Sequence, residues 1–360
     1  MSASNPPKSD ELEISVIGPG LGECLIIHLG HNEWCVVDSC IARGRQEPVA
    51  LEYLKSFGPQ TLNGLKLVIA THWHDDHIQG LASIVAQAPR AEFCCSLAVK
   101  HDELTALVAS APENIQGRSG VEELANILTQ LRRSNRSSPV YAVPNRKLFQ
   151  SSGTVPVTLT SLSPSDPMIT SAMKEILKLL PKAGEPQERI VESSPNHASV
   201  VLWLEAGDTR VLLGADLEHT NRNNEGWMGV IAQHKVTPPA LVFKVPHHGS
   251  SNAHFSEVWT KLLTPDPLAV VTPFARGSVR LPRDSDLERL AKHTHNLFCT
   301  SRGAGKPPIR DAATERWIKT QVKDRRVIEG QPGHVRIRLP IQNGPVTPSI
   351  ELFNGAYRVQ

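Results

Sequence analysis

The stretch Leu65-Lys66-Leu67-Val68-Ile69-Ala70-Thr71-His72-Trp73-His74-Asp75-Asp76-His77 decides the fold class of this chain. Its first six residues are mostly apolar and are typical of a short buried strand. Three histidines and two carboxylates follow directly, where a strand leads into a loop. His72 and His74 are one residue apart, so an extended backbone turns both imidazoles toward one point. Asp76 and His77 can turn toward a second point, and the stretch therefore predicts a dinuclear metal site.

The alternative interpretation is a solvated, histidine-rich loop. It requires three histidines and an aspartate to occur at metal-ligand spacing after a buried strand without a function, and we favour the metal site. Mixed nitrogen and oxygen ligands suit borderline divalent ions. We expect two such ions, zinc first and manganese or iron as alternatives.

Composition bounds the class of protein. The chain has 360 residues, 40% of them hydrophobic, and its length and composition are those of a globular protein of about two domains. Its net charge of +2 comes from 38 basic and 36 acidic residues, so the whole-chain field attracts neither nucleic acid nor an anionic membrane. A nucleic-acid partner would have to be held by a local basic patch.

The termini and the cysteines indicate the compartment. Residues 1–8 lack the apolar core of a signal peptide, and no run reaches the about 18 apolar residues of a membrane span. The 6 cysteines form no Cys-x-x-Cys pair and several lie in apolar runs, which favours buried thiols over disulfides or a zinc knuckle. We therefore expect a soluble, cytoplasmic protein with no membrane partner.

Apolar segments recur along the chain and end in turn, acidic or histidine residues. Residues 12–40 alternate short apolar runs with Gly-rich turns, which predicts an antiparallel meander ending at Asp38. The basic run 132–136 is interpreted as a solvated helix end rather than a nucleic-acid contact. Further strands are predicted near 93–98, 140–143, 155–159, 199–204, 210–213, 241–245 and 268–272, and helices near 48–57, 80–88, 101–110, 121–133, 168–180 and 284–293.

Two metals need more ligands than one stretch provides. Asp216 ends a buried strand after Gly214 and Ala215, and small residues allow the backbone to approach a site closely. We predict that Asp216 bridges the two metals, although an aspartate in this position is also a common turn former. His247, the first histidine after the strand 241–245, is predicted to bind the second metal. His248 would then face the substrate as a proton donor, with His254 as a weaker candidate.

Two residues complete the predicted site. Asp38 ends a strand beside Ser39 and is better placed to orient histidine ligands than to bind metal. His197 is the histidine in a suitable sequence position to be the third ligand of the first metal, with His72 and His74. An exposed loop histidine is an equally good interpretation of His197.

The segment 71–77 resembles the HxHxDH motif of the metallo-β-lactamase superfamily, with Asp38 matching its strand-end aspartate and Asp216 its bridging aspartate. Within that superfamily, segments 18–26, 211–218 and 244–250 are similar to the carboxy-terminal domain of ComEC-type DNA-uptake proteins. Those domains commonly carry Asp at the position of His74, and often Asn in the loop before strand 199–204, which Asn196 matches. Their membrane channel has no counterpart here.

The resemblance implies an α/β fold of four layers, an αββα sandwich with the metals at one sheet edge, and hydrolysis by a metal-bound hydroxide. We expect a metallo-β-lactamase-like domain over residues 1–310, with a helical insertion at about 100–194. Residues 311–360 would form a carboxy-terminal extension packed on this domain. The catalytic residues would be Asp38, Asp76 and His248, and the metal ligands His72, His74, Asp76, His77, His197, Asp216 and His247.

Three functions are compatible with this site. The favoured one is a phosphodiesterase or nuclease acting on a phosphodiester or nucleic-acid substrate. A thioesterase, lactonase or β-lactamase is less favoured, because no Gly-His-Thr-like motif lies between Ala88 and Asp216. The third is a subunit, for example in a defence complex, whose activity needs a protein partner that docks on the insertion or the tail. The sequence leaves the oligomeric state open.

Overall fold

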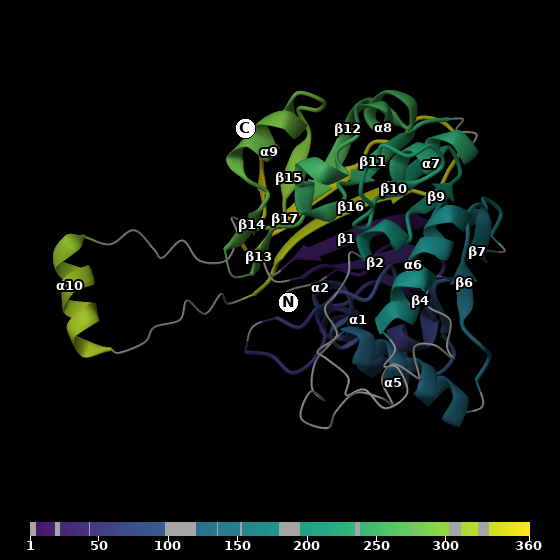
Figure 1. Cartoon of the computed structure of the whole chain (residues 1–360), viewed down its shortest axis with the longest axis horizontal. Helices are drawn as coiled ribbons and strands as arrows, with labels where there is room; N and C mark the ends of the chain where they lie inside the picture. Colours follow the sequence, from purple (N-terminus) through teal and green to yellow (C-terminus); the bar gives the residue numbers. More distant parts are fainter. Residues whose placement is uncertain are drawn as a thin grey trace.

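The structure is a computed structural model that describes residues 5–18, 22–42, 44–97, 120–134, 136–151, 153–179, 195–234, 238–276, 278–301, 311–322 and 331–360. The helix expected at 101–110 and the loop 181–194 lie outside these residues. Nearly all the strands belong to two eight-stranded sheets that pack face to face (Figure 1).

The first sheet contains the strands that precede the histidine stretch. Its strands, in spatial order, are β17 (Ser349–Phe353), β16 (Gly333–Pro340), β1 (Glu11–Gly18), β2 (Cys24–Leu29), β3 (Trp34–Val37), β4 (Leu65–Ala70), β5 (Glu92–Ser96) and β6 (Val140–Ala142). The meander β1–β2–β3 is antiparallel, as expected, and β3 to β6 then run parallel.

The second sheet carries the other predicted ligands. Its strands, in spatial order, are β18 (Tyr357–Arg358), β15 (Leu297–Cys299), β12 (Leu263–Val271), β11 (Ala240–Lys244), β10 (Thr209–Leu213), β9 (Leu202–Ala206), β8 (Val157–Ser161) and β7 (Arg146–Gln150). A separate two-stranded hairpin joins β13 (Phe274–Arg276) to β14 (Val279–Leu281).

Most of the α-helices pack on the outer faces of the two sheets, but α10 (Ala312–Gln321) buries none of its residues and covers neither sheet (Figure 1). The α-helices are α1 (Val49–Ser56), α2 (Asp75–Ile78), α3 (Leu81–Gln87), α5 (Gly120–Arg133), α6 (Asp166–Leu179), α7 (Gly226–Gln233), α8 (Ser256–Lys261), α9 (Asp284–Ala291) and α10 (Ala312–Gln321). Single 3₁₀ turns are η1 (Pro59–Gly64), η3 (Pro195–Ala198), η4 (His247–Gly249) and η5 (Ser251–Ala253).

Three hydrophobic clusters hold the layers together. One packs α1, α3 and α5 on the first sheet, one fills the space between the sheets, and one packs α7, α8 and α9 on the second sheet. Along the central strands, alternate residues contribute to different clusters: Ile26 lies in the outer cluster and Ile27 in the inner one. The expected four-layer αββα arrangement is confirmed.

The parallel strands place the predicted ligands at one edge. β3 and β4 are parallel, so their carboxyl ends bring Asp38 and the histidine stretch together. β10 and β11 are parallel in the second sheet and bring Asp216 beside His247 and His248 in the same way. The site therefore lies where the carboxyl ends of strands from both sheets meet.

The two segments assigned outside the main sheets contribute strands to them. From the range 100–194, β6 extends the first sheet, and β7 and β8 extend the second. Beyond residue 310, β16 pairs with β1 over its whole length, from Glu11 opposite Pro340 to Gly18 opposite Gly333. β17 and β18 close the edges of the two sheets. Among the described residues, no helix is long and apolar enough to span a membrane.

A buried histidine on β16 predicts acid sensitivity. His334 contacts Ser15 Oγ at 3.0 Å and stacks on Phe353, and burial lowers its pKa to about 3. Below pH ~6.5 the unfolded chain binds a proton that the folded chain does not, so stability falls as the pH drops from about 6.5 to about 3, by up to ~1.4 kcal/mol per unit. We expect His334→Gln to flatten this dependence in denaturation measurements. The exposed His295→Gln is the control, and equal slopes for parent and His334→Gln would contradict the prediction.

Candidate metal centre

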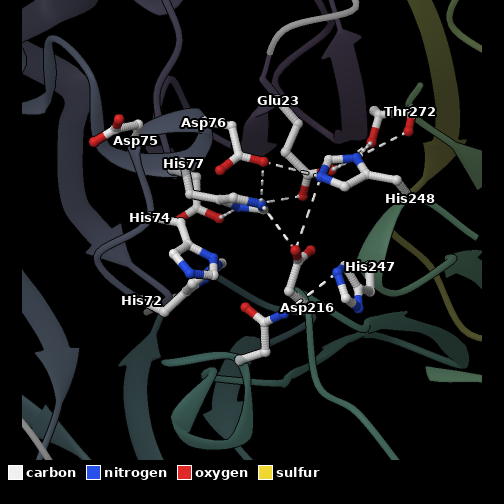
Figure 2. A network of polar contacts seen from close by, with 12 residues as sticks. Glu23, His72, His74, Asp75, Asp76, His77, Asp216, His247, His248 and Thr272 are labelled. Carbon is white, nitrogen blue, oxygen red and sulfur yellow. Dashed lines mark hydrogen bonds and ion pairs between the residues drawn. The ribbon is translucent and has the colours of Figure 1, made fainter. Parts of the chain in front are cut away.

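Four segments deliver polar side chains to the edge where the sheets meet (Figure 2). β4 ends at Ala70, His72 and His74 follow, and Asp75 begins the short helix α2. The second sheet supplies the turn after β10 and the turn η4 after β11. The hairpin segment between β1 and β2 supplies Glu23, which the sequence pattern did not identify as a site residue.

His72 and His74 form a nitrogen pair. His72 Nε2 lies 3.1 Å from His74 Nδ1, and Thr71 Oγ1 contacts the other His72 nitrogen at 3.0 Å. Burial is the main cause that lowers the pKa of both histidines, and neighbouring His77 lowers each further. Both rings are therefore neutral near pH 7, which is the protonation state that a metal ligand requires.

Asp38 orients the histidine stretch 71–77 through hydrogen bonds. Its carboxylate accepts hydrogen bonds from Thr71 N at 2.8 Å and from Thr71 Oγ1 at 2.7 Å. It also lies 2.8 Å from His77 Nδ1, and because a carboxylate only accepts, that nitrogen carries the proton. His77 Nε2 is thereby turned into the site. The positive φ of Asp38, 60°, turns the chain sharply as it leaves β3.

A second group gathers around His77 Nε2. Asp216 Oδ2 lies 3.3 Å and Asp76 Oδ2 3.5 Å from this nitrogen. His248 Nε2 lies 3.1 Å from Asp76 Oδ2 and 3.8 Å from Asp216 Oδ2. Burial disfavours charge on all these groups, but opposite charges outweigh it: the pKa values of His77 and His248 are raised, and those of Asp76 and Asp216 are lowered.

His247, expected to bind metal, and His248, expected to face the substrate, lie in different surroundings. His247 and His248 both have positive φ, 46° and 51°, so the chain reverses at η4. This reversal points the buried His248 at Asp76 and Asp216, and Thr272 O contacts its other nitrogen at 3.0 Å. His247 lies nearer the surface, with Nδ1 3.3 Å from Glu218 Oε1.

The loop before β9 presents Asn196 rather than His197 to this region. His197 is partly exposed and lies 3.8 Å from Glu218 Oε2. Asn196 Nδ2 donates to Glu218 Oε1 at 3.0 Å and lies 3.3 Å from His247 Nε2. Asn196 Oδ1 is buried without a hydrogen-bond partner. A buried amide oxygen without a hydrogen-bond partner is free to accept a cation.

Glu23 and Lys244 form a buried ion pair beneath the site. Both side chains are 1% exposed, and Lys244 Nζ contacts Glu23 Oε1. Thr272 Oγ1 donates to Glu23 Oε2. Glu23 approaches His77 Nδ1 and His248 Nδ1, each at 3.7 Å, and its ligand atoms lie within 4.8 Å of those of His77, Asp216 and His248. The only sequence signal for Glu23 was its acidic side chain next to a Gly-rich turn.

The donor set fits divalent metal ions. Asp216 Oδ1 and His77 Nε2 are buried and have no hydrogen-bond partner, although buried polar groups are normally paired. Imidazole nitrogens and carboxylate oxygens converge from both sheets, and this combination suits zinc, iron or manganese. Metal coordination would use the buried lone pairs that the protein leaves unpaired.

One protein family matches most of the chain. A family model described as the metallo-beta-lactamase superfamily matches residues 17–272. No curated protein matches the chain.

Several solved structures align with parts of the chain. The metallo-beta-lactamase fold protein YhfI from Bacillus subtilis is 13% identical, over 65% of this chain and 70% of that one, with a TM-score of 0.33. The metallo-beta-lactamase MIM-2 is 15% identical, over 57% and 58%, with a TM-score of 0.31. CmlA, a diiron β-hydroxylase from Streptomyces venezuelae, is 14% identical, over 67% and 35%, with a TM-score of 0.34. The family match, rather than these overlays, identifies the fold.

Proposed function

This chain belongs to the metallo-β-lactamase superfamily, and from that premise we propose that it is a hydrolase that uses two divalent ions to cleave phosphodiester bonds. The observation that carries the proposal is the position of Asp216. This buried carboxylate contacts His77 and His248, and its charge also acts on the pKa values of His72 and His74 (Figure 2). One carboxylate between two ligand groups is the arrangement that a dinuclear centre requires.

The proposed ligand sets follow the contacts. The first ion would be held by His72, His74, Asp216 and Asn196 Oδ1, which takes the place expected for His197. The second would be held by Asp76, His77, Asp216 and His248, which takes the place expected for His247. Glu23 is assigned to orientation because both of its oxygens already contact donors, Lys244 and Thr272.

In the proposed hydrolysis, the metal ions and the side chains of the protein have different roles. When bound, two divalent ions supply an activated water and neutralise charge on a phosphoryl oxygen. Asp38 fixes the tautomer of His77, and Thr71 fixes the orientation of His72. His247 lies at the rim, where its Nδ1 faces Glu218 Oε1 and its Nε2 faces Asn196 Nδ2. The choice of a phosphodiester rests on the resemblance of segments 211–218 and 244–250 to ComEC-type domains.

A substrate panel tests the reaction. We expect the full-length protein, supplied with zinc, manganese or iron, to hydrolyse a chromogenic phosphodiester. A thioester, a lactone and a cephalosporin should remain intact. Hydrolysis of only the last three would contradict the phosphodiesterase and favour the alternative hydrolase. Two bound metals without hydrolysis of any substrate would instead favour a subunit that needs a protein partner. Asp216→Ala is the matched inactive control.

A further inference from the structure

We propose that the hairpin β13–β14 is the arm that binds the phosphate backbone of a nucleic-acid strand next to the metal centre, with Arg276 as its principal contact. This inference rests on the proposed phosphodiesterase function and names its substrate class. It separates a nuclease from an enzyme for small diesters, because a small diester has no neighbouring phosphates to occupy the arm.

The hairpin is anchored on a proposed metal ligand. The Phe274 ring stacks on the His248 ring, with centroids 5.1 Å apart and planes inclined by 22°. Two residues earlier, Thr272 contacts His248 Nδ1 through its carbonyl and hydroxyl oxygens, at 3.0 and 3.2 Å. The start of β13 is therefore held at the centre itself, and the rest of the hairpin extends from that point.

Arg276 lies on the face of the hairpin that contacts the site. Side chains alternate along a strand, so Arg276 shares a face with Phe274, and the pairing of Arg276 with Val279 places Val279 on the same face. Arg276 Nη1 contacts Asp75 Oδ2 at 3.2 Å, and Asp75 directly precedes the proposed ligand Asp76. The guanidinium is thus tied to the residue that precedes a proposed ligand, although the Asp75 carboxylate itself points away from the centre (Figure 2).

The Asp75 contact leaves Arg276 able to bind an anion. The Arg276 side chain is 65% exposed, and its contact with Asp75 is made through Nη1. A guanidinium carries five N–H donors in a planar fork that matches phosphate oxygens. Asp75 also accepts a hydrogen bond from Gly120 N at 2.8 Å, so it is itself fixed and can hold the guanidinium in place.

The hairpin is the basic patch that a nearly neutral chain would need. The hairpin segment 274–281 contains two arginines, Arg276 and Arg280, and no acidic residue, whereas the whole chain has a net charge of +2. Both arginines are exposed. The other basic run, 132–136, is used differently: Arg136 donates to the carbonyl oxygens of Val85, Ala88 and Ala91 after α3. Arg136 thus bonds to the backbone, although the run was expected to be a solvated helix end.

The spacing suits a strand rather than a single phosphate. Consecutive phosphates of one strand are about 3.4 Å apart along a duplex axis, and strand residues advance by about 3.3 Å. A strand that runs from the metal centre along β13 would meet Arg276 on the face that carries Phe274, whereas Arg280 pairs with Ala275 and lies on the other face. Base-independent contacts of this kind fix register and orientation but not sequence.

Binding measured without catalysis tests the inference. Anisotropy of a fluorescent single-stranded oligonucleotide is recorded with the full-length protein in a chelator, so that no cleavage occurs. We expect Arg276→Gln with Arg280→Gln to weaken binding about tenfold, on the scale of one charge-assisted hydrogen bond. The slope of log K against log salt should fall by about 0.7 for each phosphate that the variant no longer neutralises. Arg90→Gln is the matched control, because the exposed Arg90 precedes β5 at the opposite end of the sheet.

The outcomes separate this inference from the proposed function. Unchanged affinity and salt slope in the double variant would overturn the inference. The inference would also be overturned if polyglutamate bound the parent as tightly as the oligonucleotide does and lost the same affinity in the double variant. Hydrolysis of a chromogenic diester without oligonucleotide binding would overturn the inference and leave the phosphodiesterase in place. Arginine-dependent binding without hydrolysis of any diester would support the arm and contradict the proposed function. Melting temperatures of the variants establish that each is folded.

Discussion

Asp216→Ala is expected to bind far less metal than the parent, which should hold about two ions per chain. The substitution removes the one carboxylate proposed to contact both ions, and it leaves His72, His74, His77 and His248 without a shared anionic partner. His72→Ala removes a ligand of the first ion alone and should lower the metal content less. Elemental analysis after dialysis against trace metal measures both variants.

A matched control lies at the other end of β10 (Thr209–Leu213). Asp208 directly precedes this strand and accepts a hydrogen bond from Gly344 N at 2.7 Å, whereas Asp216 follows the strand. Asp208→Ala should retain the parent metal content. Because a ligand that binds only the folded state stabilises it, chelation should lower the melting temperature of the parent and of Asp208→Ala but not that of Asp216→Ala. Two ions per chain in Asp216→Ala would refute the bridging assignment.

Lys244→Met is expected to destabilise the metal-free protein by about 3–5 kcal/mol, because it leaves Glu23 as an unpaired charge in a buried place. Met approximates the length of Lys without its ammonium group, so the loss reports charge rather than a cavity. Adding Glu23→Gln should recover a large part of the stability, since the double variant has no buried charge to compensate. Denaturant titrations in the presence of a chelator measure all three variants.

An exposed ion pair serves as the control for the buried pair of Lys244 and Glu23. Lys261 and Glu257 form an exposed i, i+4 pair on α8, with side chains 55% and 45% exposed. Exposed pairs contribute about 0–1 kcal/mol, so Lys261→Met should change stability little. If Lys244→Met were as mild as Lys261→Met, the ion pair beneath the site would not behave as a buried one. In the double variant of Lys244 and Glu23, the weaker orientation of His77 and His248 should also lower metal affinity about 10–100-fold.

The sequence predicted those parts of the fold and the site that depend on residues close together in the chain. The apolar run 65–70 followed by the histidine stretch predicted β4 and the nitrogen ligands, because strand periodicity and ligand spacing are both local properties. Asp38 was predicted to orient histidines, and its contacts with His77 and Thr71 agree with that role. The αββα layers followed from the resemblance and are confirmed.

The sequence was less informative where a long-range contact or a single dihedral angle determines the outcome. Which of His247 and His248 points into the site depends on the positive φ angles of both residues in η4. The residue type of a histidine does not predict such an angle. Likewise, His197 and Asn196 are neighbours, and only the path of η3 determines which of them approaches His247. No role was predicted for Glu23, because its buried contact with Lys244 joins residues from different sheets.

By itself, the sequence determined that this chain carries a histidine and carboxylate site of metal-binding type at the end of a buried strand, because residue type and spacing fix those properties. The tertiary structure alone decided which neighbours complete the site. Parallel pairing of β3 with β4 and of β10 with β11 gathers the residues within each sheet. The packing of the two sheets then joins residues far apart in sequence, such as Asp76 with His248, 172 positions away, and Glu23 with Thr272, 249 positions away. Contacts of that range depend on how two sheets pack, and no local pattern encodes them.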